Sequence, residues 1–99
     1  MLNHIIIFWL KDDLTENQLR EFRTGLEALK EIEHVNALYV GTPAKTAKRP
    51  VIDNSYDIGV TILFDSVEEH DKFQGNQLHT NFREKFSSFW SRIVIYDFE

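Results

Sequence analysis

The sequence contains four histidines, at positions 4, 34, 70 and 79, and their side chains can take part in more kinds of chemistry than the other side chains of the chain. An imidazole has an ordinary pKa of about 6.5, so near neutral pH it can take up a proton, donate a hydrogen bond or bind a metal. At His79 this chemistry could be that of a general base; the alternative is a histidine at a helix start that bonds a neighbouring carbonyl. His4 lies on an otherwise apolar strand face, where an unpaired imidazole is costly and needs a partner. His4 is therefore the first candidate for chemistry.

The other two histidines, His34 and His70, are predicted to face solvent. His70 stands beside Glu68, Glu69 and Asp71, and such a charged run favours an exposed helix surface over a metal site. No spacing of histidines and carboxylates predicts a transition-metal site, and without cysteine there are no thiolate ligands. The four glycines are isolated, so there is no glycine-rich phosphate loop. The sequence therefore predicts neither a metal nor a cofactor.

Strands at the two ends of the chain must position His4, and both are apolar on two faces. Side chains alternate across a strand, so residues 3–10 and 93–98 present apolar groups to both sides of a sheet. The side that carries His4 is predicted to form the floor of a pocket. The other side is predicted to contact a second subunit, and consists of Ile5, Ile7, Trp9, Val94, Tyr96 and Phe98. This excess of apolar surface predicts a homodimer.

Helices between the strands are marked by caps and apolar stripes. Thr15 and Gln18 form a capping box, and the helix that follows is expected to end near Lys30. Gly25 lies within this helix and indicates a close approach, room for a ligand or simply a tolerated glycine.

A second capping box, from Ser66 to Glu69, opens a short helix that breaks at residues 75–76. The third helix is expected to bury one stripe, made of Leu78, Phe82, Phe86 and Phe89.

Two further strands, at residues 34–40 and 56–64, flank a long loop at 41–55 that is a candidate flap or partner contact. The resulting order, β-α-β-β-α(α)-β, is typical of the α+β class with a ferredoxin-like split βαβ fold. We expect one domain over residues 1–99, with helices on one face of a four-stranded antiparallel sheet. Two such sheets packed face to face would form a dimeric α/β barrel.

Composition limits the partners of the chain. Its 99 residues are 42% hydrophobic and carry a net charge of −5, so no general attraction favours nucleic acid or an anionic membrane. The apolar run at residues 2–10 is too short to span a bilayer and lacks the flanks of a signal peptide. We expect a cytoplasmic protein that binds neither nucleic acid nor membrane.

Several motifs occur in the order found in one known family: Asn3–Phe8, Lys11–Thr15, Tyr56-Asp57 with Phe64, Leu78-His79 and Val94–Phe98. Together they resemble the stress-responsive dimeric α/β-barrel family, or Dabb, over essentially the whole chain. The resemblance implies the dimer and a pocket in each protomer between the sheet and the helices. The expected lining is apolar and comprises Ile6, Phe8, Phe22, Leu26, Ile58, Val60, Phe73, Phe82, Trp90, Ile93 and Ile95.

The family includes a plant polyketide cyclase that closes an aromatic ring without a metal or cofactor, and the resemblance to it is partial. His79 and His4 match its catalytic and first-strand histidines, so the resemblance implies that the two face one cavity as the candidate catalytic pair. Phe73 stands where the cyclase has its catalytic tyrosine, and a phenyl ring has no hydroxyl to move a proton. Ile58 replaces a further histidine. We therefore expect the pocket to be kept and that ring-closing reaction to be lost.

Three functions remain as alternatives. The leading one is a stress-response-type protein that binds a small hydrophobic, carbonyl-bearing molecule; any catalysis would be cofactor-independent acid–base work of lyase, cyclase or isomerase type, with His79 as base. The second is a cofactor-free or haem-handling monooxygenase of the dimeric α/β-barrel superfamily, and the third a non-catalytic structural or regulatory dimer. A cavity of about 300 Å³ or more touching His79 would favour ligand binding over the third.

Overall fold

One antiparallel sheet and three helices make up the structure, a computed structural model that describes residues 1–99. The strands lie side by side in the order β2-β3-β1-β4, which confirms the ferredoxin-like α+β prediction. The elements in chain order are β1 (Leu2–Leu10), α1 (Glu16–Ala28), β2 (Ala37–Gly41), β3 (Ile58–Phe64), α2 (Val67–Gln74), α3 (Gln77–Phe86) and β4 (Trp90–Phe98). Short 3₁₀ turns follow α1 and α3, at Leu29–Glu31 and Ser87–Phe89. No helix is both long and apolar enough to cross a membrane.

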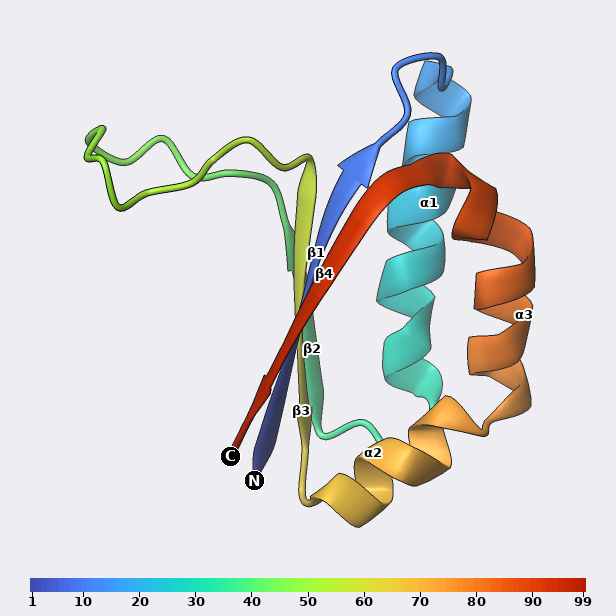
Figure 1. Cartoon of the computed structure of the whole chain (residues 1–99). Helices are drawn as coiled ribbons and strands as arrows, with labels where there is room; N and C mark the ends of the chain where they lie inside the picture. Colours follow the sequence, from blue (N-terminus) through green and yellow to red (C-terminus); the bar gives the residue numbers. More distant parts are fainter.

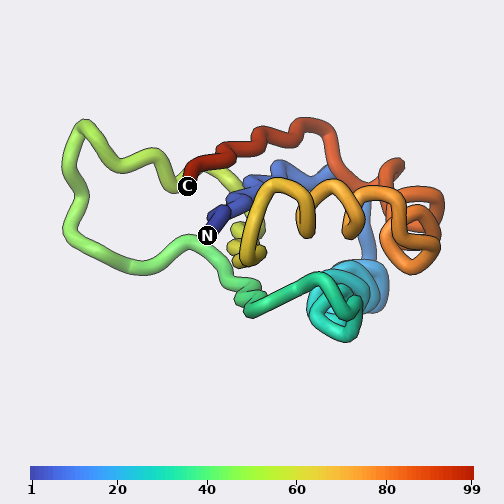
Figure 2. The backbone as a smooth tube through the Cα atoms, turned by 90° about the horizontal axis from the view of Figure 1, so that it is seen from below, coloured from blue at the N-terminus to red at the C-terminus, as the bar shows by residue number.

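The helices cover only one face of the sheet. Figure 1 shows α1 and α3 on one side of the strands, with α2 crossing below, while no helix covers the other side. The segment between β2 and β3 projects away from the helices on the uncovered side (Figures 1 and 2). We call the uncovered side of the sheet the bare face.

Strand β1 lies in the middle of the sheet and sets which side chains meet the helices. Its alternate residues, from Leu2 through His4 to Leu10, are buried, and the residues between them are half-buried. It pairs with β3 on one side and β4 on the other, and places His4 opposite Asp97. Strand alternation thus puts His4 on the helix-covered face, as the sequence predicted.

Aromatic rings fill the core beneath α1 and α3. Phe22 on α1 is fully buried and meets Phe8 edge-on at a centroid distance of 5.1 Å. A Cβ atom added at Gly25 would lie 2.5 Å from Cε2 of Phe86, which is itself buried. Gly25 therefore marks a close approach between helix and ring, the first of the three interpretations offered for it.

Helix boundaries follow the predicted caps with one exception. The reciprocal capping box of Thr15 and Gln18 is present, and the break between α2 and α3 falls at residues 75–76. The second capping box is wrong in part. Ser66 accepts the backbone N–H of Glu69 at 3.2 Å, but the Glu69 carboxylate turns to His34 instead of back to the cap.

Two other details differ from the sequence prediction. Strand β2 begins at Ala37, not at residue 34, because Val35 donates a turn hydrogen bond to the Ile32 carbonyl at 3.0 Å. Leu78 is 53% exposed, and the buried stripe of α3 instead begins at His79 and continues through Phe82. A polar residue thus occupies the first buried position of α3.

Candidate functional site

A cavity of about 260 Å³ lies over β1 and β4, under the three helices. This volume is just below the 300 Å³ that would have favoured ligand binding outright, and it suits a small ligand. Nine of the thirteen lining residues are hydrophobic, and both candidate histidines are among them. The predicted residues that line it are His4, Ile6, Phe8, Leu26, Phe73, His79, Phe82, Trp90, Ile93 and Ile95.

Three residues predicted to line the pocket do not do so. Ile58 and Val60 are buried in the core on β3, and the cavity lies over the other neighbour of β1, strand β4. Phe22 is buried among the rings around Phe8. Those three positions were wrong because the sequence alone does not separate core from cavity lining.

Three lining residues were missed: Leu29, Gln74 and Arg83. Leu29 lay on the apolar stripe of the first helix, but the two polar residues gave no signal in the sequence. Ile93 and Ile95 line the cavity yet are 39% and 47% exposed, because β4 is an edge strand. The cavity is therefore least covered along β4.

His79 lies in the first turn of α3, which Asn76 caps by accepting the Leu78 N–H at 2.8 Å. Its ring is buried, 4.7 Å between centroids from Phe73, and its Nδ1 has no hydrogen-bond partner. Burial lowers the pKa of His79, the nearby charge of Arg83 lowers it further, and a hydrogen bond to the Gln74 backbone opposes the shift. The ring is thus held neutral at pH 7, with one buried nitrogen unpartnered, in a residue that lines the cavity.

His4 has the partner that the sequence required. Its ring is only 2% exposed, and Nδ1 makes a short hydrogen bond to Oδ1 of Asp97, directly opposite on β4. Burial lowers the pKa of His4. The hydrogen bond to Asp97 and the charge of Asp97 favour the protonated form and oppose this shift, but burial is the larger effect. Asp97 was not predicted as a site residue. It could have been found, because alternation from Ile93 and Ile95 places it on the pocket side of β4.

His70 was predicted to face solvent, and that prediction is wrong. Its side chain is 16% exposed, and its ring lies 4.9 Å from that of His4 and 5.4 Å from that of Phe64, between centroids. The signal was its position three residues before the buried Phe73, since residues at that spacing share a helix face.

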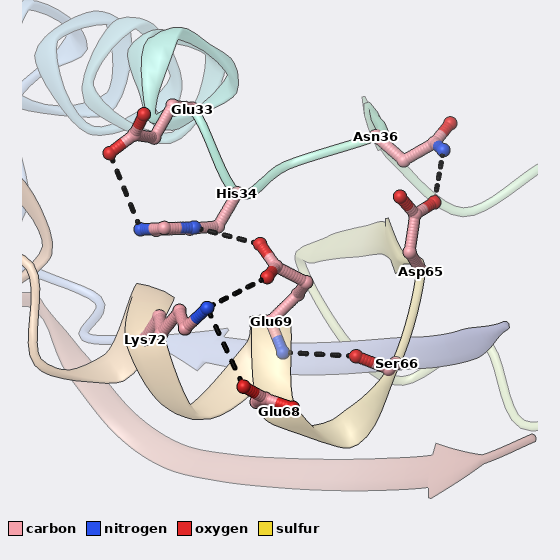
Figure 3. Close-up of polar contacts among 8 residues, drawn as sticks. All are labelled: Glu33, His34, Asn36, Asp65, Ser66, Glu68, Glu69 and Lys72. Atoms are coloured by element: carbon pink, nitrogen blue, oxygen red, sulfur yellow. Dashed lines mark hydrogen bonds and ion pairs between the residues drawn. The ribbon is translucent and has the colours of Figure 1, made fainter.

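A polar network holds α2, and with it His70, in place (Figure 3). His34 lies 2.8 Å from the Glu69 carboxylate, and Asn36 donates to Asp65 at 2.7 Å, so the connection after α1 is bonded to both ends of the β3–α2 turn. The His34 side chain is 18% exposed, so its predicted solvent orientation is wrong. The hydrogen bond from His34, then that from Lys72, lowers the pKa of Glu69. The network fixes which face of α2 is turned toward the sheet.

The structure brings together three possible metal ligands that no local spacing indicated. One ligand atom each from His4, His70 and Asp97 lies within 4.8 Å of the other two. The three come from β1, α2 and β4, so only the fold places them together.

A larger hollow of about 490 Å³ lies near the start of α1, but it lacks these features. Four of its ten lining residues are hydrophobic, and none is a histidine. Arg23, one of its lining residues, already donates hydrogen bonds to the Glu27 carboxylate at 3.1 Å and to the Val40 carbonyl at 3.2 Å. The histidine cavity is therefore the candidate site.

The bare face carries the residues predicted for the subunit contact. Tyr96 and Phe98 are 59% and 56% exposed, whereas Ile5, Ile7, Trp9 and Val94 are half-buried by their neighbours in the sheet. Trp9 is also covered by its own chain, because Arg92 stacks 4.2 Å above its ring and its indole N–H donates to Ser55 at 3.1 Å.

The fold and site define a ferredoxin-like α+β protein with a histidine-bearing cavity between sheet and helices. The chain belongs to the Stress responsive A/B Barrel Domain family, Dabb, whose model matches residues 2–99. Among characterised proteins it is similar to olivetolic acid cyclase of Cannabis sativa, with 26% identity over 98% of this chain and 94% of the cyclase.

Solved structures with the same fold include enzymes and dimers. The hydroxynitrile lyase of Passiflora edulis matches with a TM-score of 0.82 and 18% identity, over 98% of this chain and 90% of the lyase. A dimeric ferredoxin-like protein of unknown function from Thermobifida fusca matches with a TM-score of 0.79 and 19% identity, over 98% and 88% of the two chains. At these identities the likeness shows the fold alone.

Proposed function

We propose that this chain is a homodimeric Dabb protein that binds a small hydrophobic, carbonyl-bearing molecule in the histidine cavity. The observation that carries the proposal is His79, which lines an apolar cavity and whose buried Nδ1 atom has no hydrogen-bond partner. An unsatisfied buried polar atom costs about 1–3 kcal/mol, and a polar group on a ligand would remove that cost. The curated relative is named a cyclase and a structural neighbour a lyase, which supports a ligand-binding role for the cavity.

The same geometry supports cofactor-independent acid–base chemistry. A neutral His79 with an unpartnered Nδ1 can remove a proton from the carbon next to a carbonyl, which leaves an enolate, and can then return the proton. Phe73 lies against His79 where the cyclase resemblance expects a tyrosine, so no phenol is available there to assist ring closure. We therefore propose a proton-transfer step of lyase or isomerase type, not the cyclase's own reaction.

Binding is tested with matched probes, a small aromatic hydroxymethyl ketone and the ethyl ketone of the same shape, since an unprotonated Nδ1 accepts a hydrogen bond from a hydroxyl but not from a carbonyl. Trp90 lines the cavity, and a Trp9→Phe background leaves it as the one tryptophan reporter. The hydroxymethyl ketone is expected to bind about 10-fold more tightly than the ethyl ketone, and His79→Ala to remove that difference. His34→Ala, a histidine outside the cavity, serves as the matched control. Equal affinity for the two probes in the Trp9→Phe protein would refute the proposal.

The proton-transfer step has a separate readout. In D₂O, the CH₂ protons next to the carbonyl of the bound ethyl ketone are expected to exchange about 100-fold faster with the intact protein than with His79→Ala. Exchange is followed by NMR, with the ketone alone as reference. If the ketone binds but both proteins exchange its protons at the same rate, the protein is a binder and not an acid–base catalyst.

The homodimer is part of the proposal and is supported by the bare face. Its apolar residues lie on a sheet side that no helix covers, and a structural neighbour is described as dimeric. The segment between β2 and β3 projects on the same side and carries Val51, 81% exposed. Packing two bare faces together would cover both features.

A further inference from the structure

We infer that His4, His70 and Asp97 form a binding site for one divalent transition-metal ion, with zinc the best fit. Two imidazoles and one carboxylate are a ligand set that zinc and iron(II) take in proteins, with positions left open for other groups. The inference concerns a cluster at one end of the cavity and does not depend on the carbonyl-bearing ligand proposed above.

The distances between the candidate ligand atoms fit a site that closes on a metal. The three atoms lie within 4.8 Å of one another. Ligand atoms on one tetrahedral zinc lie roughly 3.3 Å apart, since each is about 2.0–2.1 Å from the metal. Nδ1 of His4 and Oδ1 of Asp97 are already in direct contact, so they must separate to admit a metal. This movement is small and is open to Asp97, the more exposed of the two.

Packing holds two of the three groups in place for a metal. His4 is only 2% exposed and lies against the Asp97 carboxylate, so its ring is already fixed beside a second ligand. His70 lies on α2, which the network of Figure 3 fixes against the rest of the chain. Asp97 is 44% exposed at its side chain and lies near the end of β4, so it can rotate with little cost.

His70 also has an outer partner of the kind that metal-binding histidines use. Its Nδ1 lies 3.1 Å from Oδ1 of Asp71, and its Nε2 contacts the side-chain amide of Gln74 at 3.3 Å. A carboxylate on one ring nitrogen orients the ring and makes the other nitrogen a better ligand. Binding through Nε2 would displace only the weak contact with Gln74.

A metal site accounts for the second histidine at this position. The rings of His4 and His70 lie 4.9 Å apart between centroids with their planes tilted by 54°, and only His4 has a strong hydrogen bond to Asp97. Apolar packing does not call for a second histidine there. A shared metal would bind both rings and neutralise the Asp97 carboxylate.

The test is zinc titration of the untagged, full-length protein by calorimetry, followed by cobalt(II) absorption spectra that report nitrogen and oxygen ligands. One zinc per chain is expected, and magnesium, which prefers oxygen ligands, is expected not to compete. His70→Ala and Asp97→Asn should each weaken zinc binding about 100-fold or more, by analogy with the 10–100-fold cost of losing an outer partner alone.

Matched controls separate this site from others on the chain. His34 beside Glu69 is the other close histidine–carboxylate contact between elements. His34→Ala removes one of the two bonds that hold α2 and should weaken zinc binding far less than His70→Ala does. His79→Ala should leave zinc affinity unchanged, which keeps this test distinct from that of the proposed function. His70→Gln guards against misfolding of the alanine variant, with circular dichroism and melting temperature as checks. Absence of stoichiometric binding, or full zinc affinity in the folded His70 variants, would overturn the inference.

Discussion

The two faces of the sheet are formed by alternate residues of the same strands, but helices cover one face and not the other. On the helix-covered face, β1 contributes His4 and Ile6, both at least 92% buried, to a cavity with two histidines. On the bare face the same strand contributes Ile5 and Ile7, and no histidine. This difference underlies our two proposals, a ligand site under the helices and a subunit contact on the bare face. Both proposals can be tested.

The largest effect is expected on the bare face. Tyr96→Asp would place a carboxylate from each protomer in the proposed subunit contact, and burying an unpaired charge is costly. We expect the dimer dissociation constant to rise roughly 100-fold or more, measured by analytical ultracentrifugation. Leu78→Asp changes a similarly exposed apolar residue on the helix side and should leave the dimer intact. If both variants behave alike, the bare face is not the interface.

The covered face is expected to respond through packing. Gly25→Ala would place a methyl group 2.5 Å from the buried Phe86 ring. Overpacking costs typically 1–3 kcal/mol and the better helix propensity of alanine returns up to about 1 kcal/mol, so we expect a net loss of about 1–2 kcal/mol in urea unfolding. Gly75→Ala, where the nearest atoms are 3.9 Å away, is the control and should change far less. A stabilised Gly25→Ala would mean that the helix and ring are not in contact.

Lowering the pH is expected to reduce the free energy of unfolding before the carboxylates of the protein take up protons. Because the pKa of His79 is lowered in the folded protein, the unfolded chain takes up this proton first, near its ordinary pKa of about 6.5. The free energy of unfolding therefore does not depend on this group well above pH 6.5, and falls as pH drops below it. Urea midpoints at about pH 7.5 and about pH 5.5 measure the change. His79→Gln should reduce it, whereas Leu78→Gln should retain it; an unchanged slope in His79→Gln would contradict the assignment.

The smallest effect is expected at the network around α2. His34→Ala removes the hydrogen bond to Glu69 but leaves the Asn36–Asp65 bond in place. Partly exposed pairs contribute little, so we expect the melting temperature to fall by a few degrees or less. Adding Asn36→Ala should deepen the loss, because the two bonds hold the same turn. A combined loss no larger than that of the single variant would show that the network does not position α2.

The fold could be predicted from the sequence because its signals are local. The Thr15–Gln18 capping box and the period of two in β1 each act over a few residues, and both are confirmed. The second capping box failed because Glu69 is engaged by His34, a residue 35 positions away. Local patterns do not report such competition between distant partners.

The site was less predictable because it is assembled from distant segments. Most of the proposed apolar lining surrounds the cavity, but Phe22, Ile58 and Val60 do not, and only the packing of rings decides which buried residues touch empty space. His70 and Asp97 were missed although helix spacing and strand alternation both placed them inward. Each pattern predicts the direction of a side chain and not its neighbour, so neither identifies the cluster with His4.

Strand β4 has a consequence that extends beyond either face. Alternate residues of this one edge strand line the cavity, at Ile93 and Ile95, and project from the bare face, at Val94 and Tyr96. In the proposed homodimer, a ligand that shifts β4 would alter the strength of self-association by the same factor by which self-association alters ligand affinity, since binding free energies are reciprocally linked. Ligand affinity would then depend on the concentration of the protein itself.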